Sequence, residues 1–182
     1  MIKYLLIILA VFQLNLIQGQ NHNGISMQDS IKIEKLLTVE IDNLKIKLLK
    51  ENKLEQQITF TLDTFQIERK MELQLEKDYS TAGMFNAGGT AIESYDALLN
   101  KYYSQLINVL DKEDQNVLKQ AQRDWLRYRD SELEFNGTFT AFKNTGGGTM
   151  YGPLALSREL EITRQRLREI FSYIHLILVT RG

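Results

Sequence analysis

The sequence predicts an all-α protein, a small helical bundle of about four to five helices built on a central antiparallel helical hairpin. Apolar residues recur at intervals of three and four along several segments, as they do on one face of a helix. The 182 residues contain a single proline, so helices are rarely interrupted. One stretch alternates like a strand, but no other segment offers it a partner, and an isolated strand is unstable.

The N-terminal residues 1–19 are typical of a secretory signal peptide. Lys3 is followed by an almost continuously apolar run over residues 4–16, and then by polar residues and Gly19. We expect cleavage after Gly19, which changes the formal charge from −1 to 21 − 23 = −2. A retained membrane anchor is the alternative, although the apolar run is shorter than the ~20 residues of a spanning helix.

The remaining chain is expected to hold a flexible leader over residues 20–30 and one helical domain over residues 31–182. Asp29 or Ser30 would cap the first helix. Its apolar stripe predicts packing on its own domain, with a docking helix for a partner as the alternative. The stripe consists of Ile33, Leu37, Ile41, Leu44 and Leu48.

The stretch ITFTLDTF, residues 58–65, is the one that alternates. We expect it to be an extended lead-in to a second helix capped at Asp63 or Thr64. The glycines of residues 80–90 then predict an interruption. A third helix over about residues 91–110 and a fourth over about residues 114–135 follow. Pro153 suits the first turn of a final helix.

The third and fourth helices are joined by the short turn DKED, so they should be antiparallel. Residues that face each other then have numbers that sum to about 225. This rule places the two members of three pairs of polar or aromatic residues opposite each other. We interpret them as a structural polar network that sets the register of the hairpin, with a functional cleft as the alternative. The pairs are Asp96 with Arg129, Asn100 with Trp125, and Tyr103 with Gln122.

Several classes of function are disfavoured by composition. The near balance of 22 basic and 23 acidic residues does not suggest nucleic acid as a partner. The absence of cysteine excludes thiolate metal sites, cysteine nucleophiles and a lipid-modified cysteine anchor. The two histidines, His22 and His175, are far apart in the sequence and form no metal-ligand pattern. We therefore predict no metal, no cofactor and no enzymatic activity.

Two segments, YDALLNKYY and LKQAQRDWLRYRDSELE, resemble the N-terminal domain family of LprI-type lysozyme inhibitors, over about residues 60–172. The resemblance implies a secreted, helical, non-enzymatic protein of the cell envelope whose named activity is inhibition of lysozyme. Many members carry a cysteine where this chain has Leu133. The matching positions are Asp96, Leu99, Asn100, Tyr103, Gln122, Arg123, Trp125, Arg129, Asp130, Gly146, Gly147, Gly148, Thr163 and Arg166.

The second glycine-rich segment is the candidate partner-binding loop. Glycine permits close backbone approach, and a methionine beside a tyrosine offers anchors for a partner. A plain connector is the alternative. We expect a secreted or periplasmic binding protein that inhibits lysozyme, or else a structural or interaction domain of the envelope with an unidentified protein partner. The loop residues are Lys143, Asn144, Thr145, Gly146, Gly147, Gly148, Thr149, Met150 and Tyr151.

Overall fold

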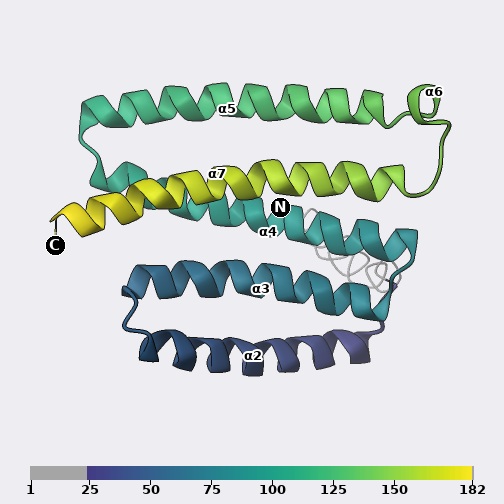
Figure 1. Ribbon diagram of the computed structural model, residues 1–182, viewed down its shortest axis with the longest axis horizontal. Helices are drawn as coiled ribbons and strands as arrows, with labels where there is room; N and C mark the ends of the chain where they lie inside the picture. The colour runs from purple at the N-terminus through teal and green to yellow at the C-terminus, as the bar shows by residue number, and fades with distance from the viewer. Residues whose placement is uncertain (1–23, 182) are drawn as a thin grey trace, which may run out of the picture.

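The computed structural model describes residues 24–181 and contains no strand within them, so the predicted all-α bundle is confirmed. The predicted signal peptide lies outside the described residues. Among the described helices, none combines the length and the apolar character of a membrane span. The helices are α2 (Met27–Lys50), α3 (Glu55–Lys77), α4 (Thr81–Val109), α5 (Lys112–Phe139), the short α6 (Phe142–Thr145) and α7 (Tyr151–Arg181) (Figure 1).

The long helices lie roughly side by side, with α2 and α3 on one side, α4 and α7 in the middle and α5 on the other side (Figure 1). The most extensive interface joins α4 to α7. Arg164 lies over the Tyr95 ring, and Phe171 packs edge-on to Tyr102. The numbers differ by 69 in both pairs, so α4 and α7 run in the same direction.

The main core forms where α3, α4 and α7 meet. Phe60 stacks on Phe171 with ring centroids 3.8 Å apart, and Tyr102 meets both rings edge-on. Tyr102 is almost fully buried, as are Leu167 and Ile170. Burial raises the pKa of the Tyr102 phenol, and its hydrogen bond to the Asp63 carboxylate adds to the effect.

Phe60 belongs to the alternating stretch, and the predicted extended lead-in is wrong. Residues 58–65 lie inside α3, which begins at Glu55 rather than after a cap at Asp63 or Thr64. The physical reason is that α3 has neighbours on opposite sides. With ~3.6 residues per turn, each helix position is rotated by about 100° from the one before it. Side chains two positions apart therefore lie on nearly opposite faces of the helix. A helix between two neighbours therefore produces the same alternation as a strand.

The predicted interruption at residues 80–90 is also wrong, because these residues form the first turns of α4. Ser80 caps the helix by accepting a hydrogen bond from the backbone amide of Gly83. A β-carbon on Gly83 would lie 2.1 Å from the backbone oxygen of Asp78. This glycine thus permits close approach of the preceding turn and does not end a helix.

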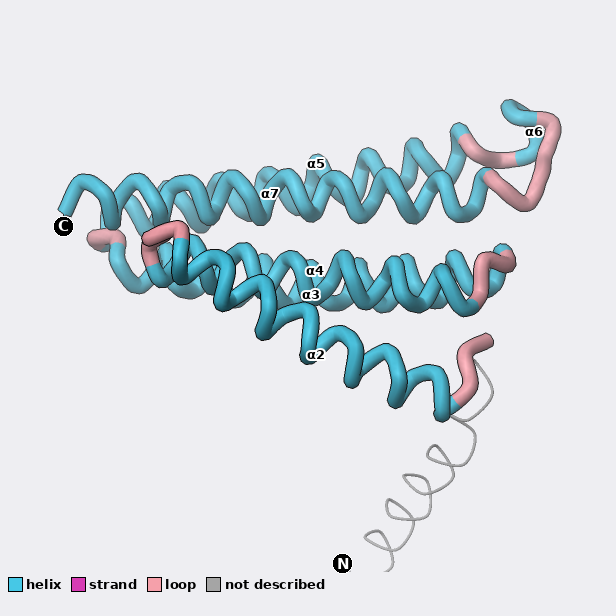
Figure 2. Tube along the Cα trace, turned by 60° about the horizontal axis from the view of Figure 1, so that its bottom comes forward, coloured by secondary structure: helices cyan, strands magenta, loops and turns pink. Residues whose placement is uncertain are grey.

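Helix α2 starts earlier than predicted, at Met27, with Ser26 rather than Asp29 or Ser30 as its cap. Its predicted stripe packs on α3, where Ile33 and Leu37 contact Leu73. Figure 2 shows α2 inclined to α3.

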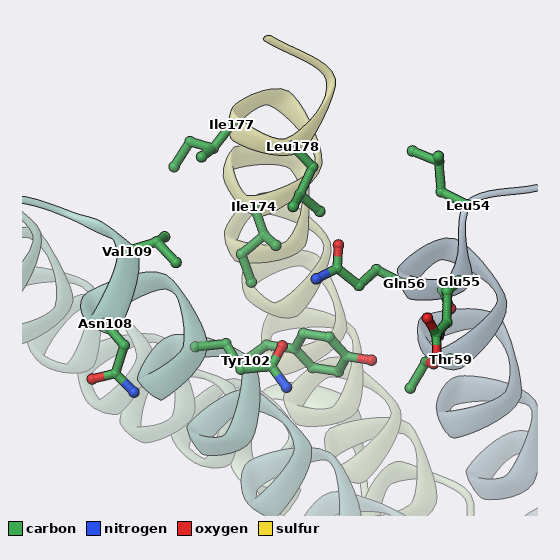
Figure 3. Close-up of a pocket in the computed structure, with 11 residues that line it drawn as sticks. Leu54, Glu55, Gln56, Thr59, Tyr102, Asn108, Val109, Ile174, Ile177 and Leu178 are labelled. Carbon is green, nitrogen blue, oxygen red and sulfur yellow. Dashed lines mark hydrogen bonds between the residues drawn. The ribbon is translucent and has the colours of Figure 1, made fainter. Parts of the chain in front are cut away.

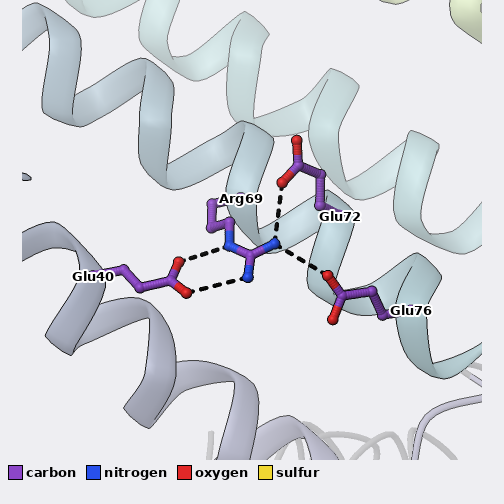
Figure 4. Close-up of polar contacts among 4 residues, drawn as sticks. All are labelled: Glu40, Arg69, Glu72 and Glu76. Atoms are coloured by element: carbon purple, nitrogen blue, oxygen red, sulfur yellow. Dashed lines mark hydrogen bonds and ion pairs between the residues drawn. The ribbon is translucent and has the colours of Figure 1, made fainter.

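An ion-pair cluster fastens α2 to α3 (Figure 4). The guanidinium of Arg69 donates to both carboxylate oxygens of Glu40, at 2.6 and 3.1 Å. The same guanidinium donates to Glu72 and Glu76 at 3.1 Å. The hydrogen bond from Arg69 lowers the pKa of the Glu40 carboxyl. The α2 stripe and this cluster both attach the helix to its own domain.

Candidate functional site

The polar residues predicted to face each other line one open cleft between α4 and α5. The cleft has a volume of about 330 Å³. All six residues of the predicted network contribute to its wall, together with Leu99, Lys119, Arg123 and Leu126. The structure therefore brings the predicted residues to one place. The cleft residues from the network are Asp96, Asn100 and Tyr103 of α4, and Gln122, Trp125 and Arg129 of α5.

Asp96 and Arg129 form an ion pair at 3.5 Å across the cleft, in agreement with the sum of 225. The side chain of Asp96 is 44% exposed and that of Arg129 is 22% exposed. Arg129 also bonds to Asp130 at 3.0 Å and lies over the Trp125 ring at 5.4 Å. Because water reaches the pair, its contribution to stability is expected to be small.

Gln122 and Trp125 are directed toward α7. Arg166 of α7 donates a hydrogen bond from Nε to the side-chain oxygen of Gln122 at 3.0 Å. The same guanidinium lies 5.8 Å from the centre of the Trp125 ring. The hydrogen-bond partner of Gln122 is thus Arg166, while Tyr103, which the predicted register places opposite Gln122, lines the same cleft.

The predicted hairpin is therefore not the tightest contact of the bundle. Both α4 and α5 have α7 as their main neighbour. Because α5 packs against α7, space remains between α5 and α4, and this space forms the cleft. The polar groups are partly exposed around it instead of being sealed between two helices.

Glu159 of α7 is an acidic residue near Asp96 and Arg129 that was not among the predicted site residues. Burial raises the pKa of its carboxyl, and the neighbouring Asp96 carboxylate raises it further, while Arg129 opposes the shift. A signal was available, because Glu159 precedes Arg166 by seven residues and therefore shares its helix face. Thr163 lies between them, is buried, and donates from its hydroxyl to the backbone oxygen of Glu159.

The candidate loop is tied down at several points. Lys143, Asn144 and Thr145 lie in α6, residues 146–150 form the link, and Tyr151 begins α7. The Tyr151 hydroxyl donates to the backbone oxygen of Thr145 at 3.3 Å, and the Asn144 amide donates to that of Thr138 at 2.8 Å. Gly146, Gly147 and Gly148 have φ of 75°, 79° and 140°, a region that favours glycine.

Large apolar side chains stand exposed around this loop, and only Met150 among them was predicted from the sequence. Phe135 and Phe139 are four residues apart on one face of α5, with ring centroids 5.9 Å apart. Met150 of the loop and Leu154 of α7 are also more than half exposed, as are both phenylalanines. We call these four residues the loop end. The spacing of the two phenylalanines was a usable signal for a surface aromatic pair.

The chemistry of the site favours binding. Within residues 24–181, no three histidine or acidic side chains are grouped so as to hold a metal ion. The cleft offers amides, a phenol and an ion pair open to water. The loop end offers exposed apolar anchors on a braced backbone.

A family model described as "Lysozyme inhibitor LprI" matches residues 74–170. That stretch is 97 of the 182 residues and contains α4, α5, the loop and the cleft. No curated protein and no solved structure matches the chain.

Proposed function

Since the chain belongs to the LprI family of lysozyme inhibitors, we propose that it is a secreted or periplasmic, non-catalytic protein that binds a lysozyme and blocks it. The matched stretch includes both the cleft and the loop end. The protein partner is accordingly proposed to be a lysozyme.

The observation that carries the proposal of a contact surface is the loop end. Aromatic residues are enriched among the side chains that dominate binding energy at protein interfaces. Here Phe135, Phe139 and Met150 are each more than half exposed in the described part of the chain. They surround a loop whose backbone is held by internal hydrogen bonds, so little conformational entropy is lost when a partner binds.

The position of the loop supports the same proposal. It lies at one tip of the elongated bundle, beyond the ends of α5 and α7 (Figure 1). A projecting tip has a shape suited to a concave site such as an enzyme cleft. With a formal net charge of −1, attraction between whole molecules adds little, so the contact is proposed to be mainly apolar.

Clearing of cell-wall suspensions by several lysozyme classes, with increasing amounts of the purified protein, tests this proposal. We expect slower clearing with at least one class. The double variant Phe139→Ala, Met150→Ala should inhibit more weakly. The concentration of this variant needed for the same slowing of clearing should be roughly tenfold higher or more, because two anchors are lost. Val117→Ala is the matched control, because it removes an exposed apolar side chain from the far end of α5.

Unchanged clearing with every class at high molar excess would contradict inhibition. The alternative function, an interaction domain of the envelope with another protein partner, would then be tested by capture from envelope extract. Capture that depends on Phe139 and Met150, without any effect on clearing, is the result that favours the alternative.

A further inference from the structure

The end of the bundle opposite the glycine loop carries a second exposed surface, at the corner between α2 and α3. Ile46, Leu49 and Leu54 are each about half exposed there. Lysines alternate with them along the chain, and all are exposed. We call this surface the basic corner. It consists of Lys45, Ile46, Lys47, Leu49, Lys50, Lys53 and Leu54.

The positive charge of the basic corner is largely uncompensated. Glu51 pairs with Lys53 at 3.0 Å, while Lys45, Lys47 and Lys50 form no ion pair within the described residues. Four lysines and Glu51 give a formal charge of 4 − 1 = +3, and the following Glu55 reduces it to +2.

Three of the four acidic residues of α2 are engaged away from the corner, while Asp42, three residues before Lys45, forms no ion pair within the described residues. Glu34 pairs with Lys70 and Glu40 with Arg69, both of which belong to α3. Asp29 pairs with Lys32 at the far end of α2. Acidic groups therefore help to fasten α2 to its neighbour, and the lysines of the corner remain available to an anion.

The turn between α2 and α3 places the two leucines of the corner at openings on either side of the first turn of α3. Asn52 has φ of 51°, the one positive value outside glycine among the described residues, and it lets the chain reverse between Lys50 and Glu55. Leu49 and Lys53 line an opening of about 450 Å³ between α2 and α3.

On the other side of the first turn of α3 lies a larger pocket of about 810 Å³. Leu54 lies across this pocket from Ile174 and Leu178 of α7, and Val109 lines it from α4 (Figure 3). Leu54 therefore belongs both to the lysine-bearing turn and to the wall of this pocket.

We propose that the basic corner binds the surface of a bilayer that contains anionic lipids. Lysines attract anionic headgroups, and aliphatic side chains beside them enter the boundary between headgroups and acyl chains. A protein interface would favour aromatic residues and arginine, and residues 45–54 contain neither. The corner precedes residues 74–170, so the surface is independent of the proposed lysozyme contact.

The test uses the full chain, whose lack of cysteine allows a single labelled position. An environment-sensitive fluorophore on Leu49→Cys is expected to shift to the blue with vesicles of mixed phosphatidylcholine and phosphatidylglycerol. Pure phosphatidylcholine should give no shift, and high salt should reverse it. The same label on Tyr128→Cys, an exposed position of α5, should stay unchanged. This comparison separates the corner from any contact made by the N-terminal segment.

Matched charge variants complete the test. Lys47→Gln, Lys50→Gln is expected to weaken partition onto the mixed vesicles by roughly thirtyfold at low salt, the usual effect of two lysines near an anionic surface. Lys32→Gln, Lys35→Gln removes the same charge from the other end of α2 and should change partition less than about twofold.

The absence of a blue shift from the Leu49→Cys label with the mixed vesicles would overturn the proposal. Equal loss of partition in the two charge variants would also overturn it. If polyglutamate gave the same blue shift of the Leu49→Cys label, the corner would be a cationic patch that binds any polyanion. If only free dodecanoate gave the shift, the ligand would be a soluble amphiphile and not a bilayer. Either result also overturns it. Clearing of cell walls is not part of these measurements, so their failure leaves the lysozyme proposal standing.

Discussion

Arg166 of α7 donates a hydrogen bond to the side-chain oxygen of Gln122 on α5 at 3.0 Å, and its guanidinium faces the Trp125 ring. The Arg166 side chain is only 11% exposed and also pairs with Glu169 at 3.1 Å. One side chain thus links α7 to the polar face of α5.

We predict that Arg166→Ala lowers the free energy of unfolding by ~2–3 kcal/mol, because it removes a charged hydrogen bond and leaves the Gln122 oxygen unpaired. Urea denaturation followed by circular dichroism measures this. Arg168→Ala is the control, since Arg168 is exposed on the same helix, and it should change stability by less than ~0.5 kcal/mol. Equal effects of the two variants would contradict a linking role for Arg166.

The ion pair between Asp96 and Arg129 is predicted to be weak. A double-mutant cycle with Asp96→Asn and Arg129→Gln should give a coupling free energy of ~0.2–1 kcal/mol, because the carboxylate is 44% exposed. A coupling of ~3 kcal/mol or more would instead support the sealed structural network that the sequence suggested.

Glu40 predicts a loss of stability in acid. Its pKa is lower in the folded protein than in the unfolded chain, so the stabilisation is present above the unfolded value of ~4.3 and is lost as the pH falls through the folded value. In Glu40→Gln, the free energy of unfolding should therefore fall less steeply below about pH 4.3. Denaturation at a series of pH values checks the slope, and an unchanged slope would contradict the prediction.

The raised pKa of Glu159 predicts the opposite dependence of stability on pH. Its pKa is higher in the folded protein, so the folded state favours the protonated form and stability falls as the pH rises through this range. Glu159→Gln is expected to stabilise the protein at neutral pH and not at low pH. A destabilised Glu159→Gln at neutral pH would show that its carboxylate is needed by Arg129.

Replacing two glycines of α4 with alanine is predicted to have opposite effects on stability. Gly83→Ala should lower stability by ~1–3 kcal/mol, although alanine favours helix, because its β-carbon would collide with the backbone of Asp78. Gly89→Ala has open space around it and should raise stability by ~0.5–1 kcal/mol. Thermal unfolding of both variants tests the pair, and two stabilised variants would contradict the close approach at Gly83.

Local features of the sequence predicted the helical class and the opposition of Asp96 and Arg129, because a short turn determines the register of the two helices it joins. The sequence did not predict that α7 would be the main neighbour of α4, since that choice depends on contacts between distant segments. Phe60 was misjudged for the same reason, because its alternating stretch reflects packing of α3 against two neighbours. Gly83 was misjudged for another reason, because a glycine that permits close approach of the preceding turn looks in the sequence like one that ends a helix.

Helix α7 begins beside the glycine loop and ends beside the pocket that contains Leu54. Its 31 residues span about 46 Å at ~1.5 Å per residue. The bundle thus separates its two proposed contacts: a lysozyme held by the loop end and a bilayer held by the basic corner would lie about 46 Å apart. Neither would crowd the other, and the affinity at one end should be independent of occupancy at the other.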